Sequence, residues 1–118
     1  LKGILTFGSQ GPIGAGRAIK ERNKAEQIVL VGACSPTQGK KLVKDGIIKV
    51  GYIWSPPEAG KAIITVAKMV LDGKEITDGM EIPGLGKVTV DPQTRVIRAI
   101  KVLAIDKNTV DELVALGL

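Results

Sequence analysis

Three serines and one tryptophan are the side chains whose types and positions could do chemistry in this chain. Ser9, Ser35 and Ser55 each stand in a short polar turn, and Trp54 directly precedes the last of them. Hydroxyl groups both donate and accept hydrogen bonds, so the serines suit a neutral polyol, and Trp54 could form an aromatic wall of its pocket. Each serine taken alone is equally consistent with simple turn chemistry.

Catalytic chemistry is not indicated by the composition. The chain has no histidine, which removes the commonest general base and leaves the serines without an activating partner. The carboxylates are scattered near turns and helix ends rather than paired. The single cysteine, Cys34, excludes an internal disulfide and suits a small buried apolar position. We therefore predict a binding protein that is not an enzyme and that uses no cofactor or metal.

Each polar turn lies between a strand-like apolar run and a proline that opens a helix-like run. The predicted strands are 2–7, 27–33 and 47–54, and the predicted helices are 12–22, 36–45 and 57–72. Proline suits the first helical position, because its missing N–H has no partner there anyway. This series predicts an α/β fold with a parallel sheet and helical crossovers, in which ligands bind outside the carboxyl ends of the strands.

Periodicity adds detail to these elements. The near-continuous apolar run at 27–33 predicts a strand that is covered on both faces, and 2–7 also reads as a buried strand. Helical spacing places Ile13, Ala18 and Ile19 on the inner face of the first helix. A later stretch, 95–105, could form one longer strand. The residues predicted to share one face of the third strand are Ile48, Val50, Tyr52 and Trp54.

A glycine-rich stretch at 8–16 supports an alternative function. A glycine-rich turn before a helix exposes backbone N–H groups, so the chain could be a free-standing α/β module that binds an anion or nucleotide there. The stretch fits neither the dinucleotide fingerprint nor the P-loop, because no Lys-Ser or Lys-Thr follows the last glycine. The net charge is +5, but aromatic residues make up only 3% of the chain, so we predict no nucleic-acid partner.

Five motifs together resemble a known family. They are Gly-Ala-Cys-Ser-Pro at 32–36, Val-Lys-Asp-Gly-Ile-Ile-Lys at 43–49, Tyr-Ile-Trp-Ser-Pro at 52–56 with Ala59-Gly60, Ile-Pro-Gly-Leu-Gly-Lys-Val-Thr-Val at 82–90 and Asp-Lys-Asn-Thr-Val-Asp at 106–111. In this order and spacing they resemble the C-terminal part of type I periplasmic sugar-binding proteins of ABC importers. The most similar branch is that of the autoinducer-2 and rhamnose receptors.

The resemblance implies a domain organisation and a set of ligand-binding residues. Such receptors have two α/β lobes joined by three crossovers, and they close on a ligand without chemistry. By this comparison 1–55 is part of the C-terminal lobe, 56–75 is a crossover helix that belongs to the N-terminal lobe, and 76–118 is the return crossover and tail. The ligand-binding residues that it implies are Phe7, Ser9, Gln10, Cys34, Ser35, Trp54 and Ser55.

The resemblance also implies a ligand, partners and a location. The ligand would be a sugar or an autoinducer-2-like molecule, and the intact protein would meet the membrane subunits of an ABC importer. The parent protein would be periplasmic or extracellular and membrane-anchored, although no signal sequence opens this chain. An apolar stripe on the helix at 57–72 would contact the missing N-terminal lobe or mediate self-association; it consists of Ala59, Ile63, Val66, Ala67 and Val70.

Overall fold

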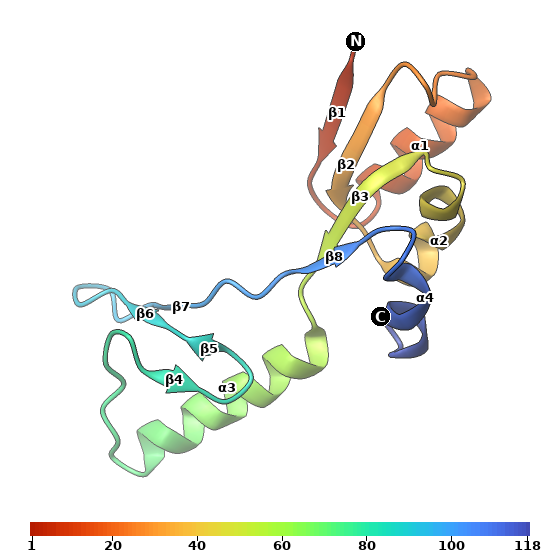
Figure 1. Ribbon diagram of the computed structural model, residues 1–118. Helices are drawn as coiled ribbons and strands as arrows, with labels where there is room; N and C mark the ends of the chain where they lie inside the picture. Colours follow the sequence, from red (N-terminus) through yellow and green to blue (C-terminus); the bar gives the residue numbers. More distant parts are fainter. The chain divides into compact units, whose positions relative to one another are not determined.

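The computed structural model describes residues 1–118 and divides into two compact units (Figure 1). Unit 1 comprises Leu1–Ile53 together with Leu103–Leu118, and unit 2 comprises Trp54–Val102. None of the helices has both the length and the apolar character needed to cross a membrane.

Unit 1 is built on one four-stranded sheet. Its elements are β1 (Gly3–Thr6), α1 (Gly11–Glu21), β2 (Val29–Ala33), α2 (Pro36–Lys44), β3 (Ile48–Ile53), β8 (Leu103–Ile105) and α4 (Val110–Ala115). The strand order is β1-β2-β3-β8, in which the first three strands are parallel and β8 runs antiparallel to β3. The parallel α/β arrangement predicted from the strand–proline–helix series is therefore confirmed.

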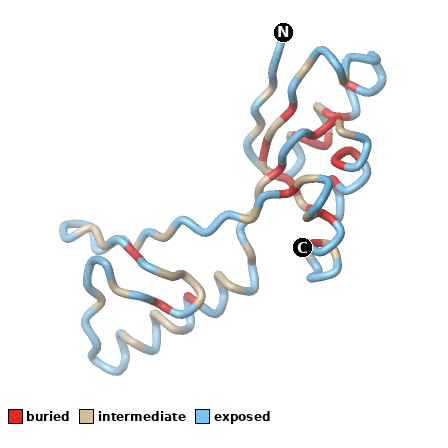
Figure 2. The backbone as a smooth tube through the Cα atoms, viewed as in Figure 1, coloured by how far each residue is buried: buried red, intermediate tan, exposed pale blue.

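The helices of unit 1 all cover the same face of the sheet (Figure 1). The strand order advances from β1 to β3 without reversal, and right-handed crossovers then place consecutive helices on one side. Figure 2 shows that the buried residues of unit 1 lie on the strands and on the helices that cover them. The fully buried core there includes Leu30, Val43, Ile48, Ile105 and Val110. Burial of each of these side chains contributes about 1.5–3 kcal/mol to folding.

The other face of the sheet is uncovered. Leu5 is 61% exposed, and Val29 and Val50 are also exposed. The predictions that 27–33 is covered on both faces and that 2–7 is buried are therefore wrong. The physical reason is that β2 receives helices on one face only, and that β1 is the edge strand of the sheet.

The structure also differs from the predicted inner faces of the third strand and of the first helix. Leu30 pairs with Ile48, whereas Val31 pairs with Val50, so an extra residue bulges from β3 between the two pairs. The bulge leaves Ile48 in the core and Val50 exposed, so the third strand does not keep one continuous apolar face. In α1 the prediction for Ala18 is wrong, because the inner face continues from Ile13 to Ile19 through Gly16.

The strands β1 and β2 approach very closely at the last residue of β1, and only glycine fits opposite it. A Cβ atom on Gly32 would lie 2.0 Å from Thr6 Oγ1 and 2.6 Å from the Thr6 carbonyl oxygen. A Cβ atom on Gly11, at the start of α1, would lie 2.8 Å from Thr6 Cβ. The end of β1, the start of α1 and Gly32 of β2 therefore meet at Thr6.

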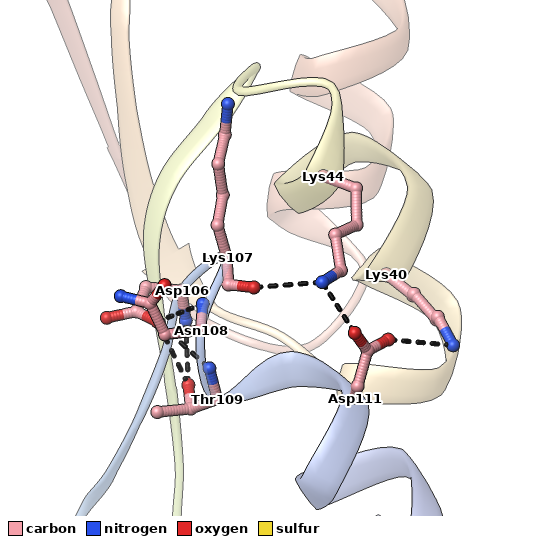
Figure 3. A network of polar contacts seen from close by, with 7 residues as sticks. All are labelled: Lys40, Lys44, Asp106, Lys107, Asn108, Thr109 and Asp111. Atoms are coloured by element: carbon pink, nitrogen blue, oxygen red, sulfur yellow. Dashed lines mark hydrogen bonds and ion pairs between the residues drawn. The ribbon is translucent and has the colours of Figure 1, made fainter.

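The C-terminal segment returns to unit 1 and is anchored on α2 (Figure 3). Asp111 forms ion pairs with Lys40, at 2.9 Å, and with Lys44. The ammonium group of Lys44 also donates a hydrogen bond to the backbone carbonyl of Lys107, at 2.9 Å. At the other end of α2, the N–H and the hydroxyl of Thr37 both donate to the backbone oxygen of Leu118.

Unit 2 is built on α3 (Pro56–Leu71) and two short antiparallel ladders. In these, β4 (Glu81–Ile82) pairs with β5 (Gly86–Lys87), and β6 (Thr89–Val90) pairs with β7 (Ile97–Arg98). The prediction of one strand over 95–105 is wrong, because the chain passes from unit 2 to unit 1 after Val102 and β7 and β8 pair with different strands.

Most apolar residues of the helix α3 are not buried within unit 2. The buried apolar side chains of this unit are Ala62, Ile82 and Val88. An open apolar groove of about 460 Å³ runs beside them, lined by Ala59, Ala62, Ile63, Val66, Ala67, Leu85 and Ile97. Most of the stripe that the sequence places on this helix therefore lines an open groove.

Replacing Gly32 by alanine should destabilise unit 1, because the Thr6 carbonyl oxygen is backbone and cannot rotate away. Overpacking costs about 1–3 kcal/mol, and we expect at least the upper end of this range in urea unfolding followed by circular dichroism. Gly14→Ala is the matched control, since a Cβ atom there meets nothing within 4 Å and alanine favours the helix by about 0.5–1 kcal/mol. An unchanged unfolding midpoint for Gly32→Ala would contradict the close contact.

The Asp111 anchor should make stability depend on pH. Hydrogen bonds from Lys44 and then Lys40 hold the pKa of Asp111 below its ordinary value. The stabilisation that these ion pairs give to the folded state is therefore fully present above about pH 4, and it is lost as the pH falls through the lowered pKa of the folded state. We expect Asp111→Asn to lower the melting temperature at pH 7, and the difference from the unaltered chain should shrink as the pH falls below about 4. Glu112→Gln removes a neighbouring charge outside this network, and an equal effect there would contradict the anchor.

Candidate functional site

The carboxyl ends of β1, β2 and β3 lie at one edge of the sheet of unit 1, because these strands are parallel and adjacent. The turns that leave β1 and β2 therefore bring together five of the predicted site residues, which are Phe7, Ser9, Gln10, Cys34 and Ser35. The other two, Trp54 and Ser55, are the first residues of unit 2.

The turn after β1 exposes its side chains to solvent. Phe7 is 80% exposed, and Ser9 and Gln10 are also exposed. Gly8 takes a positive φ of 86°, and the N–H of Gly11 donates to its carbonyl, which closes the turn. Gln10 precedes α1, but its side chain does not cap the helix. Its amide group is instead available for other contacts.

The Cys34 thiol lies inside the core rather than at the edge. Cys34 is 2% exposed, and its sulfur packs so closely on the backbone of β3 that a Cβ atom on Gly51 would lie 2.7 Å from it. Burial raises the pKa of the Cys34 thiol, so the group stays protonated and uncharged. The backbone N–H of Cys34 donates to the Tyr52 carbonyl, at 3.2 Å, and extends the ladder beyond β2.

Ser35 and Ser55 occupy the same position before their helices but differ in their hydrogen bonds. The Ser55 hydroxyl accepts from the N–H of Glu58, at 3.4 Å, and so caps α3. The Ser35 hydroxyl makes no such contact with α2. Turn chemistry therefore accounts for Ser55, whereas the Ser35 hydroxyl remains available at the edge of the sheet.

Trp54 is the single aromatic residue of unit 2 and is 60% exposed. It directly follows β3 in the chain. An exposed indole next to a helix start offers a flat apolar face and one N–H donor. These are the properties that an aromatic wall against a sugar ring requires.

Packing explains two of the glycines that suggested an anion site. Gly11 is needed for the contact with Thr6, and a Cβ atom on Gly16 would lie 2.9 Å from Leu42 Cδ1. These positions bring α1 close to β1 and α2. The number of glycines in this stretch therefore does not by itself argue for a phosphate ligand.

One polar residue of the edge was missed from the sequence. Gln38 lies in the first turn of α2, and its Oε1 accepts a hydrogen bond from Gln10 Nε2, at 3.0 Å. The contact joins the turns after β1 and β2. The signal was present, because the first turn of a helix that follows a parallel strand lies at the carboxyl edge of the sheet.

The comparisons with solved structures bear on the fold. LsrB from Clostridium saccharobutylicum in complex with AI-2 matches with a TM-score of 0.70 at 19% identity, over 95% of this chain and 39% of that one. A sugar ABC transporter from Actinomyces odontolyticus matches with a TM-score of 0.76 at 18% identity, over 95% and 36%. An ABC transporter solute binding protein from Agrobacterium vitis with bound D-fucose matches with a TM-score of 0.67 at 22% identity, over 100% and 34%.

These matches share one property, which is that the chain spans between 34% and 39% of the length of each solved structure. The similarity confirms the predicted fold class. A family model described as a periplasmic binding protein domain matches residues 1–75, which include both turns of the edge and Trp54-Ser55. The chain belongs to the periplasmic binding protein domain family.

Proposed function

We propose that this chain forms part of a solute-binding protein that captures a neutral sugar or an autoinducer-2-like molecule for an ABC importer. The observation that carries the proposal is the edge of the sheet in unit 1. It presents uncharged hydrogen-bonding side chains, Ser9, Gln10 and Ser35, beside the exposed ring of Phe7. Family membership and the AI-2 and D-fucose named for two structural neighbours support the same class of ligand.

Within this proposal each site residue has a role that its surroundings allow. Ser9, Gln10 and Ser35 would exchange hydrogen bonds with sugar hydroxyls, while Phe7 and Trp54 would pack on the C–H faces of the ring. Cys34 would contribute through its backbone, and Ser55 would hold the start of α3 and so position Trp54. The protein would bind and release its ligand without chemical change.

The proposed whole protein has two lobes. Residues 1–55 would belong to one lobe, 56–75 would cross to the other, and 76–118 would return and form the tail. The apolar groove along α3 would then pack against the remainder of the first lobe, and a second copy of this chain is the alternative occupant. The periplasm or the outer cell surface is the proposed location.

The isolated chain should bind sugars weakly. In a two-lobed receptor each lobe supplies about half of the contacts, and burial of the ligand comes from closure. Calorimetry of the 118-residue chain with D-fucose should therefore give a Kd in the millimolar range or no measurable heat. The control is the full-length parent protein under the same conditions. Micromolar affinity for the 118 residues alone would contradict the two-lobed proposal.

Trp54→Ala should weaken ligand binding while leaving the stability of the protein nearly unchanged. The indole is mostly exposed, so its removal from the full-length parent should leave the melting temperature nearly unchanged. The loss of its packing on the sugar should weaken binding about tenfold, if the contact contributes about 1.4 kcal/mol. Thermal melts and calorimetry on the same samples provide both measurements. A large drop in melting temperature with unchanged affinity would instead identify Trp54 as a structural residue.

A further inference from the structure

We propose that Lys101 is a positioning residue, which restrains the turn that carries Trp54 by joining the returning chain to the start of α3. The proposal rests on the proposed function, in which Trp54 packs on a sugar ring. Lys101 lies outside the five motifs that carry the family resemblance, and it belongs to no helix or strand.

Residues 99–102 form a strap between β7 and β8. The strap belongs to neither strand ladder. Of its three apolar residues Ala99 is partly buried, whereas Ile100 is 95% exposed and Val102 is 56% exposed. Ladder pairing and apolar burial therefore do little to hold the strap. Lys101 is the residue of the strap that can hold it against unit 2 through polar contacts.

The ammonium group of Lys101 contacts two segments of unit 2. Its Nζ lies 3.7 Å from Glu58 Oε2, in the first turn of α3, and donates a hydrogen bond to the Gly84 carbonyl oxygen, at 3.3 Å. Gly84 stands between β4 and β5, and a Cβ atom there would lie 3.3 Å from the Glu58 carbonyl oxygen. Lys101 therefore joins the strap, the β4–β5 turn and the start of α3.

Glu58 connects this contact to the turn that carries Trp54. The backbone N–H of Glu58 donates to the Ser55 hydroxyl, at 3.4 Å, and Ser55 directly follows Trp54. The hydrogen bond and the charge of Lys61, and then the charge of Lys101, hold the pKa of Glu58 below its ordinary value. The carboxylate is therefore charged at neutral pH and attracts the Lys101 ammonium group.

The strap also leads into the strand that holds the other side of the turn. Leu103 follows two residues after Lys101 and pairs with Ile53, the residue before Trp54. Residues 101–103 thus contact the chain before and after Trp54, each contact lying within its own unit. A turn that is held on both sides samples fewer conformations, so it loses less entropy when a ligand orders it.

The expected effect on binding is small, because the ion pair is exposed. The side chains of Lys101 and Glu58 are 52% and 36% exposed, and exposed pairs change an equilibrium constant by about fivefold at most. Lys101→Met keeps the apolar stem and removes the charge. In the full-length parent it should weaken D-fucose binding about twofold to fivefold. Lys101→Arg keeps the charge and the donors, so it should preserve the affinity.

Trp54 is the only tryptophan of the chain, so its fluorescence anisotropy decay reports on this turn directly. In the 118-residue chain, Lys101→Met should increase the amplitude of the fast component of the decay. About 1 M sodium chloride should move the unaltered chain toward this behaviour, because the Debye length falls to about 3 Å. The same salt should leave the decay of Lys101→Met unchanged.

Lys74→Met is the matched control for both measurements. Lys74 is an exposed lysine of unit 2 that takes part in no ion pair, and its replacement removes the same charge. The anisotropy decay of Trp54 and the affinity for D-fucose should both match those of the unaltered protein.

The remaining outcomes separate this proposal from the proposed function. An unchanged Trp54 decay in Lys101→Met would overturn the restraint, whatever the parent binds. A changed decay with unchanged D-fucose affinity would overturn the role of Lys101 in binding, while the proposed function stands. If the unaltered parent does not bind D-fucose, the proposed function fails for this sugar and the role of Lys101 in binding it fails too, whereas the decay still decides whether the restraint exists.

Discussion

The parallel pairing of β1, β2 and β3 determines where the helices and the polar turns of unit 1 lie. Three adjacent strands that point the same way bring their carboxyl ends to one edge, and crossovers of one hand bring α1 and α2 to one face. The polar turns and the helix starts are then neighbours, although they are far apart in the chain. Within these 118 residues the same rule places no helix on the second face of the sheet, where Leu5, Val29 and Val50 are exposed.

Close contacts at small residues maintain this arrangement. Gly32 admits Thr6, Gly16 admits Leu42, and Gly51 admits the sulfur of Cys34. A Cβ atom at Gly32 or Gly51 would lie within 3 Å of Thr6 or of the Cys34 sulfur, and one at Gly16 would require the Leu42 side chain to shift. The glycines therefore serve packing, and the proposed binding edge presents uncharged hydroxyls and amides.

The C-terminal segment influences the site although it lies outside it. Thr37 donates to the Leu118 oxygen at the start of α2, and Asp111 holds Lys40 and Lys44 further along the same helix. Because the backbone N–H of Thr37 in the first turn of α2 already donates to the Leu118 oxygen, the Ser35 hydroxyl is not required as its acceptor. In unit 2 no such partner is present, and Ser55 caps α3 itself. Two similar sequence turns thus acquire different roles.

The sequence by itself determined the strand–turn–helix order, the parallel sheet and the polar edge, because proline position and apolar runs act locally. It also indicated the family through the motifs at 32–36 and 52–56. Only the tertiary structure decided that the sheet is covered on one face, that a bulge separates Ile48 from Val50, and that Gln38 meets Gln10. These features depend on pairing between distant segments, and local periodicity carries no information about which segments pair.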